Sequence, residues 1–117
     1  MTIDEFIVIF EKEAEANLIK VKESNIKKLY DYMNYILEWN KVINLTAIED
    51  EEEFIVKHFI DSLTILKYIN DGIKLIDIGT GAGFPGMPIK LLNDTVNITL
   101  VDSVNKKMNV LKKYHKK

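Results

Sequence analysis

The chain has 117 residues, 47% hydrophobic and 29% charged, a composition typical of one globular domain. It contains no cysteine, which excludes disulfides, thiolate metal sites and a cysteine nucleophile within this sequence, and its two histidines are too far apart in the sequence to indicate a metal centre. No apolar run approaches the roughly 20 residues that span a bilayer, and the N-terminus lacks the basic start of a signal peptide, so we expect a cytoplasmic protein.

The charge is unevenly distributed. Residues 1–104 carry a net charge of −8, whereas residues 105–117 carry six lysines and no acid. A basic segment of this kind either attracts nucleic acid or forms a solvated helix face, and charge alone leaves both interpretations open.

Three helices are predicted in the first 70 residues. Thr2 and Glu5 form a capping-box pattern at the start of the first helix. Ser24 is predicted to cap the second helix, and an acidic run at residues 49–53 favours the start of a third that continues to about Ile69. Asn70-Asp71-Gly72 is expected to end that helix. The second helix has apolar residues at helical spacing: Ile26, Leu29, Tyr30, Met33, Ile36 and Leu37.

The remaining sequence predicts a strand, a glycine turn, a helix, a second strand and a last helix. The strands are Leu75–Ile78 and Asn97–Asp102, and the helices are Met87–Leu92 and a segment from near Ser103. We therefore expect an α/β fold class, with a helical extension at residues 1–70 and the start of a larger domain at residues 71–117. Two parallel strands do not complete a sheet, so we expect a truncated domain with open edges that favour self-association.

The most informative segment is the glycine turn between the first strand and its helix. Gly79, Gly81 and Gly83 allow positive φ angles, and a helix that begins just beyond them offers unpaired N–H groups to a ligand. The spacing Gly81-x-Gly83-x-x-Gly86 also fits a dinucleotide site, but a lone match of that kind is weak. Asp77 would repel a pyrophosphate and attract the ammonium group of a methionine moiety.

The order apolar-Asp-apolar-Gly-x-Gly-x-Gly resembles the first motif of class I (Rossmann-like) S-adenosylmethionine-dependent methyltransferases. An ordinary turn and an NAD(P)-dependent oxidoreductase are the alternatives. Asp102 ends the second strand, 19 residues after Gly83, where a carboxylate accepts hydrogen bonds from ribose hydroxyls. Both cofactor classes share that position, so Asp102 indicates a nucleoside site without choosing between them.

Four further motifs extend the resemblance from about Ile26 to Leu111. They are Trp39-Asn40 followed by Asn44-Leu45-Thr46-Ala47-Ile48, His58-x-x-Asp61-Ser62-Leu63, Phe84-Pro85-Gly86-Met87-Pro88, and Val101-Asp102-Ser103 followed by Lys106-Lys107. Together they resemble the glucose-inhibited division protein B (GidB) family, bacterial enzymes that form 7-methylguanosine in 16S ribosomal RNA. The family implies a class I methyltransferase fold after a helical extension, with about the last half of the domain missing from this sequence.

The resemblance implies S-adenosyl-L-methionine as cofactor and 16S rRNA or the small ribosomal subunit as substrate, with no membrane partner. The expected cofactor-binding residues are Asp77, Gly79, Gly81, Gly83, Phe84 and Asp102. Catalytic residues are unassigned and no metal ligand is expected. A cofactor-binding fragment without activity is a third reading of the chain.

Five polar or aromatic residues have two interpretations each. His58 and Asp61 lie three apart on a helical face, so they either line the cofactor cleft or pair with each other and orient the third helix. Trp39 either stacks on a base or anchors the helical extension, and Asn40 and Asn44 either contact RNA or hold a turn.

Overall fold

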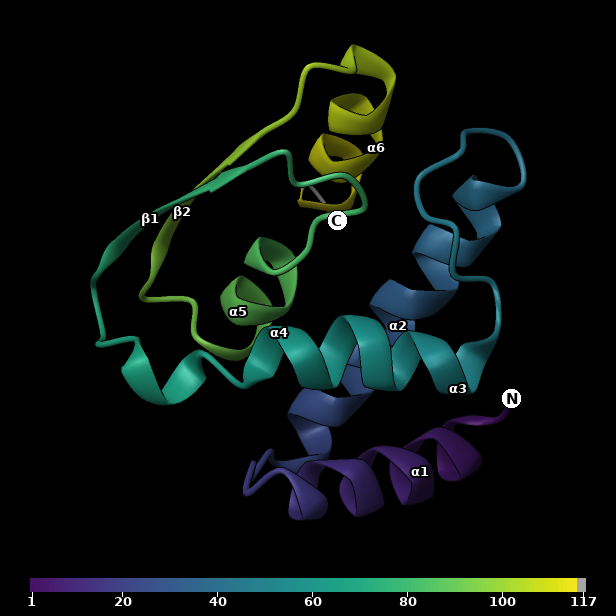
Figure 1. Ribbon diagram of the computed structural model, residues 1–117, viewed down its shortest axis with the longest axis vertical. Helices are drawn as coiled ribbons and strands as arrows, with labels where there is room; N and C mark the ends of the chain where they lie inside the picture. The colour runs from purple at the N-terminus through teal and green to yellow at the C-terminus, as the bar shows by residue number, and fades with distance from the viewer. Residues whose placement is uncertain (116–117) are drawn as a thin grey trace.

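The computed structural model describes residues 1–115, with helices at the N-terminal end and a small α/β unit packed beside them (Figure 1). Helix α1 spans Ile3–Ala16 and α2 spans Glu23–Asn40. After a third helical segment come β1 (Lys74–Ile78), α5 (Gly86–Leu92), β2 (Asn97–Val101) and α6 (Asn105–His115). This order confirms the prediction of helices followed by βαβα.

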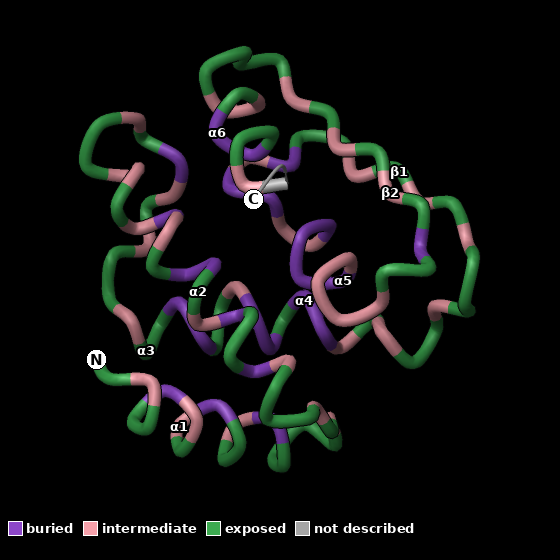
Figure 2. The backbone as a smooth tube through the Cα atoms, turned by 180° about the vertical axis from the view of Figure 1, so that it is seen from behind, coloured by how far each residue is buried: buried purple, intermediate pink, exposed green. Residues whose placement is uncertain are grey.

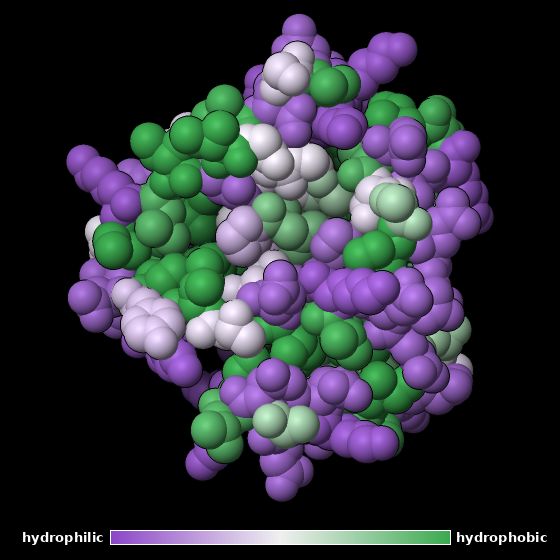
Figure 3. Space-filling model, in the orientation of Figure 1, coloured by the Kyte–Doolittle hydropathy of each residue, from purple (hydrophilic) through white to green (hydrophobic). Residues whose placement is uncertain are grey.

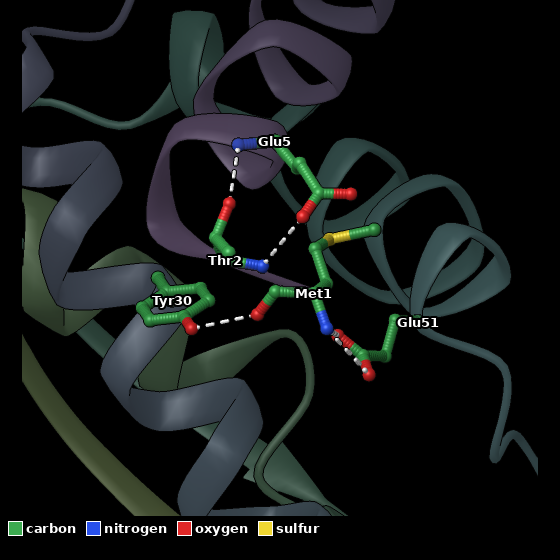
Figure 4. Close-up of polar contacts among 5 residues, drawn as sticks. All are labelled: Met1, Thr2, Glu5, Tyr30 and Glu51. Atoms are coloured by element: carbon green, nitrogen blue, oxygen red, sulfur yellow. Dashed lines mark hydrogen bonds and ion pairs between the residues drawn. The ribbon is translucent and has the colours of Figure 1, made fainter.

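The start of α1 is fixed by its own cap and by two neighbouring helices. Thr2 Oγ1 accepts a hydrogen bond from the Glu5 N–H at 3.2 Å, and the Glu5 carboxylate accepts one from the Thr2 N–H at 3.1 Å, so the predicted capping box is confirmed. The Met1 ammonium lies 3.3 Å from Glu51 Oε2. The Met1 carbonyl accepts a hydrogen bond from the Tyr30 hydroxyl at 2.8 Å (Figure 4).

Helix α2 begins before the predicted cap. Its N-cap is Lys22, without a side-chain hydrogen bond, and Ser24 lies exposed inside the first turn. Glu23 at the first position is favourable there, because a carboxylate stabilises the positive end of a helix. The predicted apolar stripe is largely confirmed, but Tyr30 and Leu37 are only half-buried. The buried residues of this helix are Ile26, Leu29, Tyr32, Met33 and Ile36.

The third helical segment is not the single regular helix that we predicted. It consists of α3 (Glu51–Glu53), a π-helical stretch η1 (Phe54–Ile60), α4 (Asp61–Leu63) and, after a turn, a 3₁₀ piece η2 (Leu66–Tyr68). In a π-helix the hydrogen bonds join residues five apart. The wider turn brings Phe54 and Phe59, and likewise Ile55 and Ile60, to the core side, and all four are buried. The core therefore favours the irregular backbone.

Strands β1 and β2 pair in parallel, from Lys74 opposite Asn97 to Ile78 opposite Val101. Helix α5 connects them and covers one face of the sheet. The opposite face is open, since Ile76 is 69% and Ile78 is 80% exposed. The side of the molecule where the strands lie is largely hydrophobic (Figure 3). This finding agrees with the expectation of an incomplete sheet.

The helical part and the α/β part share one hydrophobic core. Its buried side chains come from α1, α2, η1, the glycine turn, α5 and α6, and include Phe10, Tyr32, Phe59, Ala82, Met87 and Leu111. Figure 2 shows the buried positions along α1, α2 and α5 turned toward the centre of the molecule. No helix within residues 1–115 is long and apolar enough to cross a membrane.

Candidate cofactor site

The turn between β1 and α5 follows a backbone path that glycine favours. Its φ angles are +71° at Gly79, +56° at Gly81 and +94° at Gly83. A side chain in this left-handed region costs about 1–2 kcal/mol per residue. The structure therefore confirms that these three positions adopt positive φ.

Asp77 connects β1 to the turn and to α5. Its Oδ2 accepts a hydrogen bond from Thr80 Oγ1 at 2.7 Å and another from the Gly86 N–H at 3.0 Å. The prediction of free N–H groups at the start of α5 was therefore wrong: Asp77 occupies the Gly86 donor, and the Met87 N–H donates to the Gly83 carbonyl at 2.7 Å. A carboxylate at this place disfavours a pyrophosphate, which dinucleotide-binding folds hold at the same helix start.

Asp102 connects the end of β2 to the same turn. Its Oδ1 accepts a hydrogen bond from the Val104 N–H and its Oδ2 accepts one from the Gly81 N–H, each at 2.9 Å. These two bonds, led by that from Val104, hold the pKa of Asp102 below its ordinary value. The ionised carboxylate therefore lies against Gly81, and its oxygens retain lone pairs for further donors.

Most backbone donors of the turn are already used within the protein. The N–H groups of Gly79 and Thr80 both donate to the Val101 carbonyl, that of Gly81 donates to Asp102, and that of Gly83 donates to the Thr80 carbonyl. Within residues 79–83 of the described chain, the Ala82 N–H alone has no acceptor. A ligand of this turn would therefore bind through carbonyls, the two carboxylates and that one amide.

Phe84 joins the turn to the helical extension. Its ring stacks on His58 with a centroid distance of 4.2 Å and an interplanar angle of 8°. Phe54, Phe59 and Tyr32 contact the same ring edge to face, at 5.6–5.8 Å. Three aromatic rings of the helical extension therefore hold Phe84, in addition to the ring of His58.

His58 is held as a neutral ring. Its Nε2 lies 2.8 Å from Thr46 Oγ1, which already accepts a hydrogen bond from the Ile48 N–H at 3.1 Å. The Thr46 hydroxyl and His58 Nε2 are therefore hydrogen-bond partners, and the tautomer of the ring sets which of the two donates. Burial lowers the pKa of His58, and this effect exceeds the opposing influence of the Asp61 carboxylate. The hydrogen-bond partner of His58 is thus Thr46 and not Asp61.

A surface hollow of about 370 Å³ lies beside His58. Its lining includes Lys57, His58, Asp61, Ser62, Phe84 and Pro85, so two of the sequence motifs meet there. Hollows of about 360 and 350 Å³ lie at the α1–α2 connection and between α5, β2 and α6. None of the predicted cofactor residues lines either of those two, so volume alone does not identify the site. Residues 1–115, as described, contain no cluster of acids and histidines suited to a metal ion.

For Trp39 and Asn40, the contacts in the structure support the structural interpretation. The Lys113 ammonium lies over the Trp39 ring, 4.9 Å from its centroid, so Trp39 joins α2 to α6. Asn40 Oδ1 accepts hydrogen bonds from the N–H groups of Leu45 at 2.8 Å and Thr46 at 3.0 Å, which holds the loop after α2.

Sequence reasoning missed two residues of the site. Thr80 bonds Asp77, and the signal for it was a hydroxyl three residues after a strand carboxylate. Tyr32 donates a hydrogen bond to the Ala82 carbonyl at 2.6 Å, across 50 residues of sequence. No local pattern could have indicated that contact.

Comparison with known proteins identifies the family of the chain. The family model described as GidB, rRNA small subunit methyltransferase G, matches residues 25–117. The chain belongs to this family. It is 46% identical over 110 residues to a protein of Clostridium beijerinckii and 48% identical over 108 residues to one of Desulforamulus reducens, each named ribosomal RNA small subunit methyltransferase G. A protein of the same name from Alkaliphilus oremlandii is 42% identical over 105 residues.

The chain covers less than half the length of these family members. The alignments include 88–91% of this chain but only 44–45% of each relative. The family resemblance inferred from the motifs is confirmed, as is the α/β class of the fold.

Proposed function

We propose that this chain contributes part of a cytoplasmic methyltransferase that uses S-adenosyl-L-methionine and methylates nitrogen-7 of a guanosine in 16S rRNA. The observation that carries the proposal is the pair of carboxylates around the glycine turn. Asp77 lies on β1 with its carboxylate at the start of α5, where it accepts a hydrogen bond from the Gly86 N–H. Asp102 follows β2 and accepts one from the Gly81 N–H of the glycine turn. Membership of a family named for rRNA methylation supports the substrate class.

The residues present fit this cofactor. Asp102 accepts the ribose hydroxyls through lone pairs that the backbone leaves free. Asp77 Oδ2 is occupied by Thr80 and Gly86, so its Oδ1 acts near the methionine ammonium, directly or through water. Gly79, Gly81 and Gly83 line the methionine and ribose side, and Phe84 forms the apolar wall that follows them.

Methylation of this acceptor requires little from the protein beyond alignment of the reacting atoms. The cofactor supplies a methyl group on a positively charged sulfur, which is already activated for displacement. Nitrogen-7 of guanine has a free lone pair and loses no proton before it attacks, so a strong general base is unnecessary. Holding the acceptor in line with the methyl group then provides much of the rate acceleration. We assign no catalytic residue to this chain.

The test is transfer of a labelled methyl group to unmodified 16S rRNA or small ribosomal subunits, with the nucleosides separated and identified by mass spectrometry. We expect the label in 7-methylguanosine. Label in another nucleoside would overturn the base assignment. If the chain binds S-adenosylhomocysteine but transfers no label, the chain is a cofactor-binding fragment without activity.

The open sheet also supports association between copies of this chain. Ile76 and Ile78 are exposed on the uncovered face, and both strands of the described sheet have an unpaired edge. Light scattering over a range of concentrations would detect dimers, whereas a monomeric mass at high concentration would contradict self-association.

A further inference from the structure

Tyr32 lies at the point where the helical extension meets the glycine turn. It is completely buried on α2, and its hydroxyl donates a hydrogen bond to the Ala82 carbonyl at 2.6 Å. Burial raises the pKa of Tyr32 well above its ordinary value, so the hydroxyl keeps the proton that it donates.

This hydrogen bond fixes the orientation of one peptide group of the turn. The Ala82 carbonyl and the Gly83 N–H belong to the same planar peptide. The Gly83 N–H donates to the Thr80 carbonyl at 2.9 Å, so the peptide is held at both ends. A flip of this peptide group about the chain direction would break both hydrogen bonds and redirect the neighbouring backbone.

The Tyr32 ring also contacts the elements on both sides of the site. It meets Phe84 edge to face with a centroid distance of 5.8 Å and an angle of 69°. It meets Tyr114 of α6 at 4.9 Å and 80°, and α6 begins three residues after Asp102. A Cβ atom on Gly83 would overlap the Tyr32 hydroxyl, which shows how closely this side chain approaches the turn.

We propose that Tyr32 is a positioning residue for the cofactor: its hydroxyl sets the peptide between Ala82 and Gly83, so the helical extension determines the shape of the glycine turn. The cofactor part of this inference rests on the function proposed above. The claim about the shape of the turn does not depend on it.

The experiment compares Tyr32→Phe with the matched control Tyr30→Phe. Both tyrosines lie on α2 and donate one hydrogen bond to a backbone carbonyl, but Tyr30 bonds Met1, away from the turn (Figure 4). Hydrogen exchange of the Gly83 and Phe84 amides is measured without ligand and normalised to the global stability from urea unfolding. We expect faster normalised exchange at these two amides in Tyr32→Phe alone. Equal normalised exchange in both variants would overturn the proposal.

Titration with S-adenosylhomocysteine gives the second readout. We expect the Kd to rise about tenfold in Tyr32→Phe, which corresponds to about 1.4 kcal/mol, and to stay within about twofold in Tyr30→Phe. An unchanged Kd in a folded Tyr32→Phe chain would limit Tyr32 to a structural role. Failure of the unaltered chain to bind this ligand would count against the proposed function, while the exchange result would still decide the claim about the turn.

If Tyr32→Phe does not fold, hydrogen exchange in the unaltered chain tests the proposal instead. In urea below the unfolding midpoint, the amides of the turn and those of α2 around Tyr32 are expected to open together, with the same dependence on urea. If the turn opens while this part of α2 stays protected, the two are not coupled and the proposal fails.

Discussion

Replacing Gly83 by alanine adds one methyl group at the most crowded point of the glycine turn. The new Cβ would overlap the Tyr32 hydroxyl and lie 2.7 Å from Met87 Cγ. The φ angle of +94° costs about 1–2 kcal/mol for a residue with a side chain. Overpacking of a filled core adds about 1–3 kcal/mol. We therefore expect Gly83→Ala to lower the free energy of unfolding by about 2–5 kcal/mol.

Gly79→Ala separates these two contributions. Gly79 has a similar φ angle of +71°, but no atom lies within 4 Å of its Cβ position. We expect Gly79→Ala to lower the free energy of unfolding only by the cost of its positive φ angle, about 1–2 kcal/mol. The measurement is urea unfolding followed by circular dichroism, with the midpoint and slope determined for each variant. Equal losses for the two variants would refute the close approach of Tyr32 to the turn.

Three further substitutions test the site. Asp102→Ala should raise the Kd for S-adenosylhomocysteine roughly tenfold or more, because hydrogen bonds to a charged carboxylate are lost; Asp94→Ala is the control, and an unchanged Kd would remove Asp102 from the site. Thr80→Val should cost about 1–3 kcal/mol in urea unfolding because Asp77 loses a buried donor, whereas Thr80→Ser keeps the hydroxyl; a similar cost for both would argue against this bond. Because the pKa of His58 is lowered by folding, the unfolded chain binds more protons as the pH falls below about 6.5, so stability decreases there. His58→Gln should flatten the pH dependence of unfolding between about pH 7 and 5, and an unchanged slope would contradict the half-buried, neutral ring.

The elements near strong local signals could be predicted from the sequence. The capping box at Thr2 fixes the start of α1. Gly72 adopts a positive φ angle of +76° as expected, but it lies in the turn before β1, because the last helical piece already ends at Tyr68 and Ile69 is extended. Both features depend on residues close together in the chain. The same holds for the strands and for the glycines of the turn, whose chemistry follows from a missing side chain.

What could not be predicted depends on contacts between distant residues. The π-helical stretch η1 forms because Phe54 and Phe59 are both buried in the shared core, which no pattern of helical period reveals. Asp77 was expected to face a ligand, but Gly86 and Thr80 reach its carboxylate only once α5 has packed on the sheet. Tyr32 approaches the turn from a helix 50 residues earlier, so its role was invisible in the sequence.

We propose that the turn with Asp77 and Asp102 binds S-adenosylmethionine and not a dinucleotide. The decisive measurement is calorimetric titration of this chain with S-adenosylhomocysteine and, separately, with NAD. We expect heat of binding with S-adenosylhomocysteine, a large loss of affinity in Asp102→Ala, and no binding of NAD. Selective binding of NAD would instead identify the turn as a dinucleotide site.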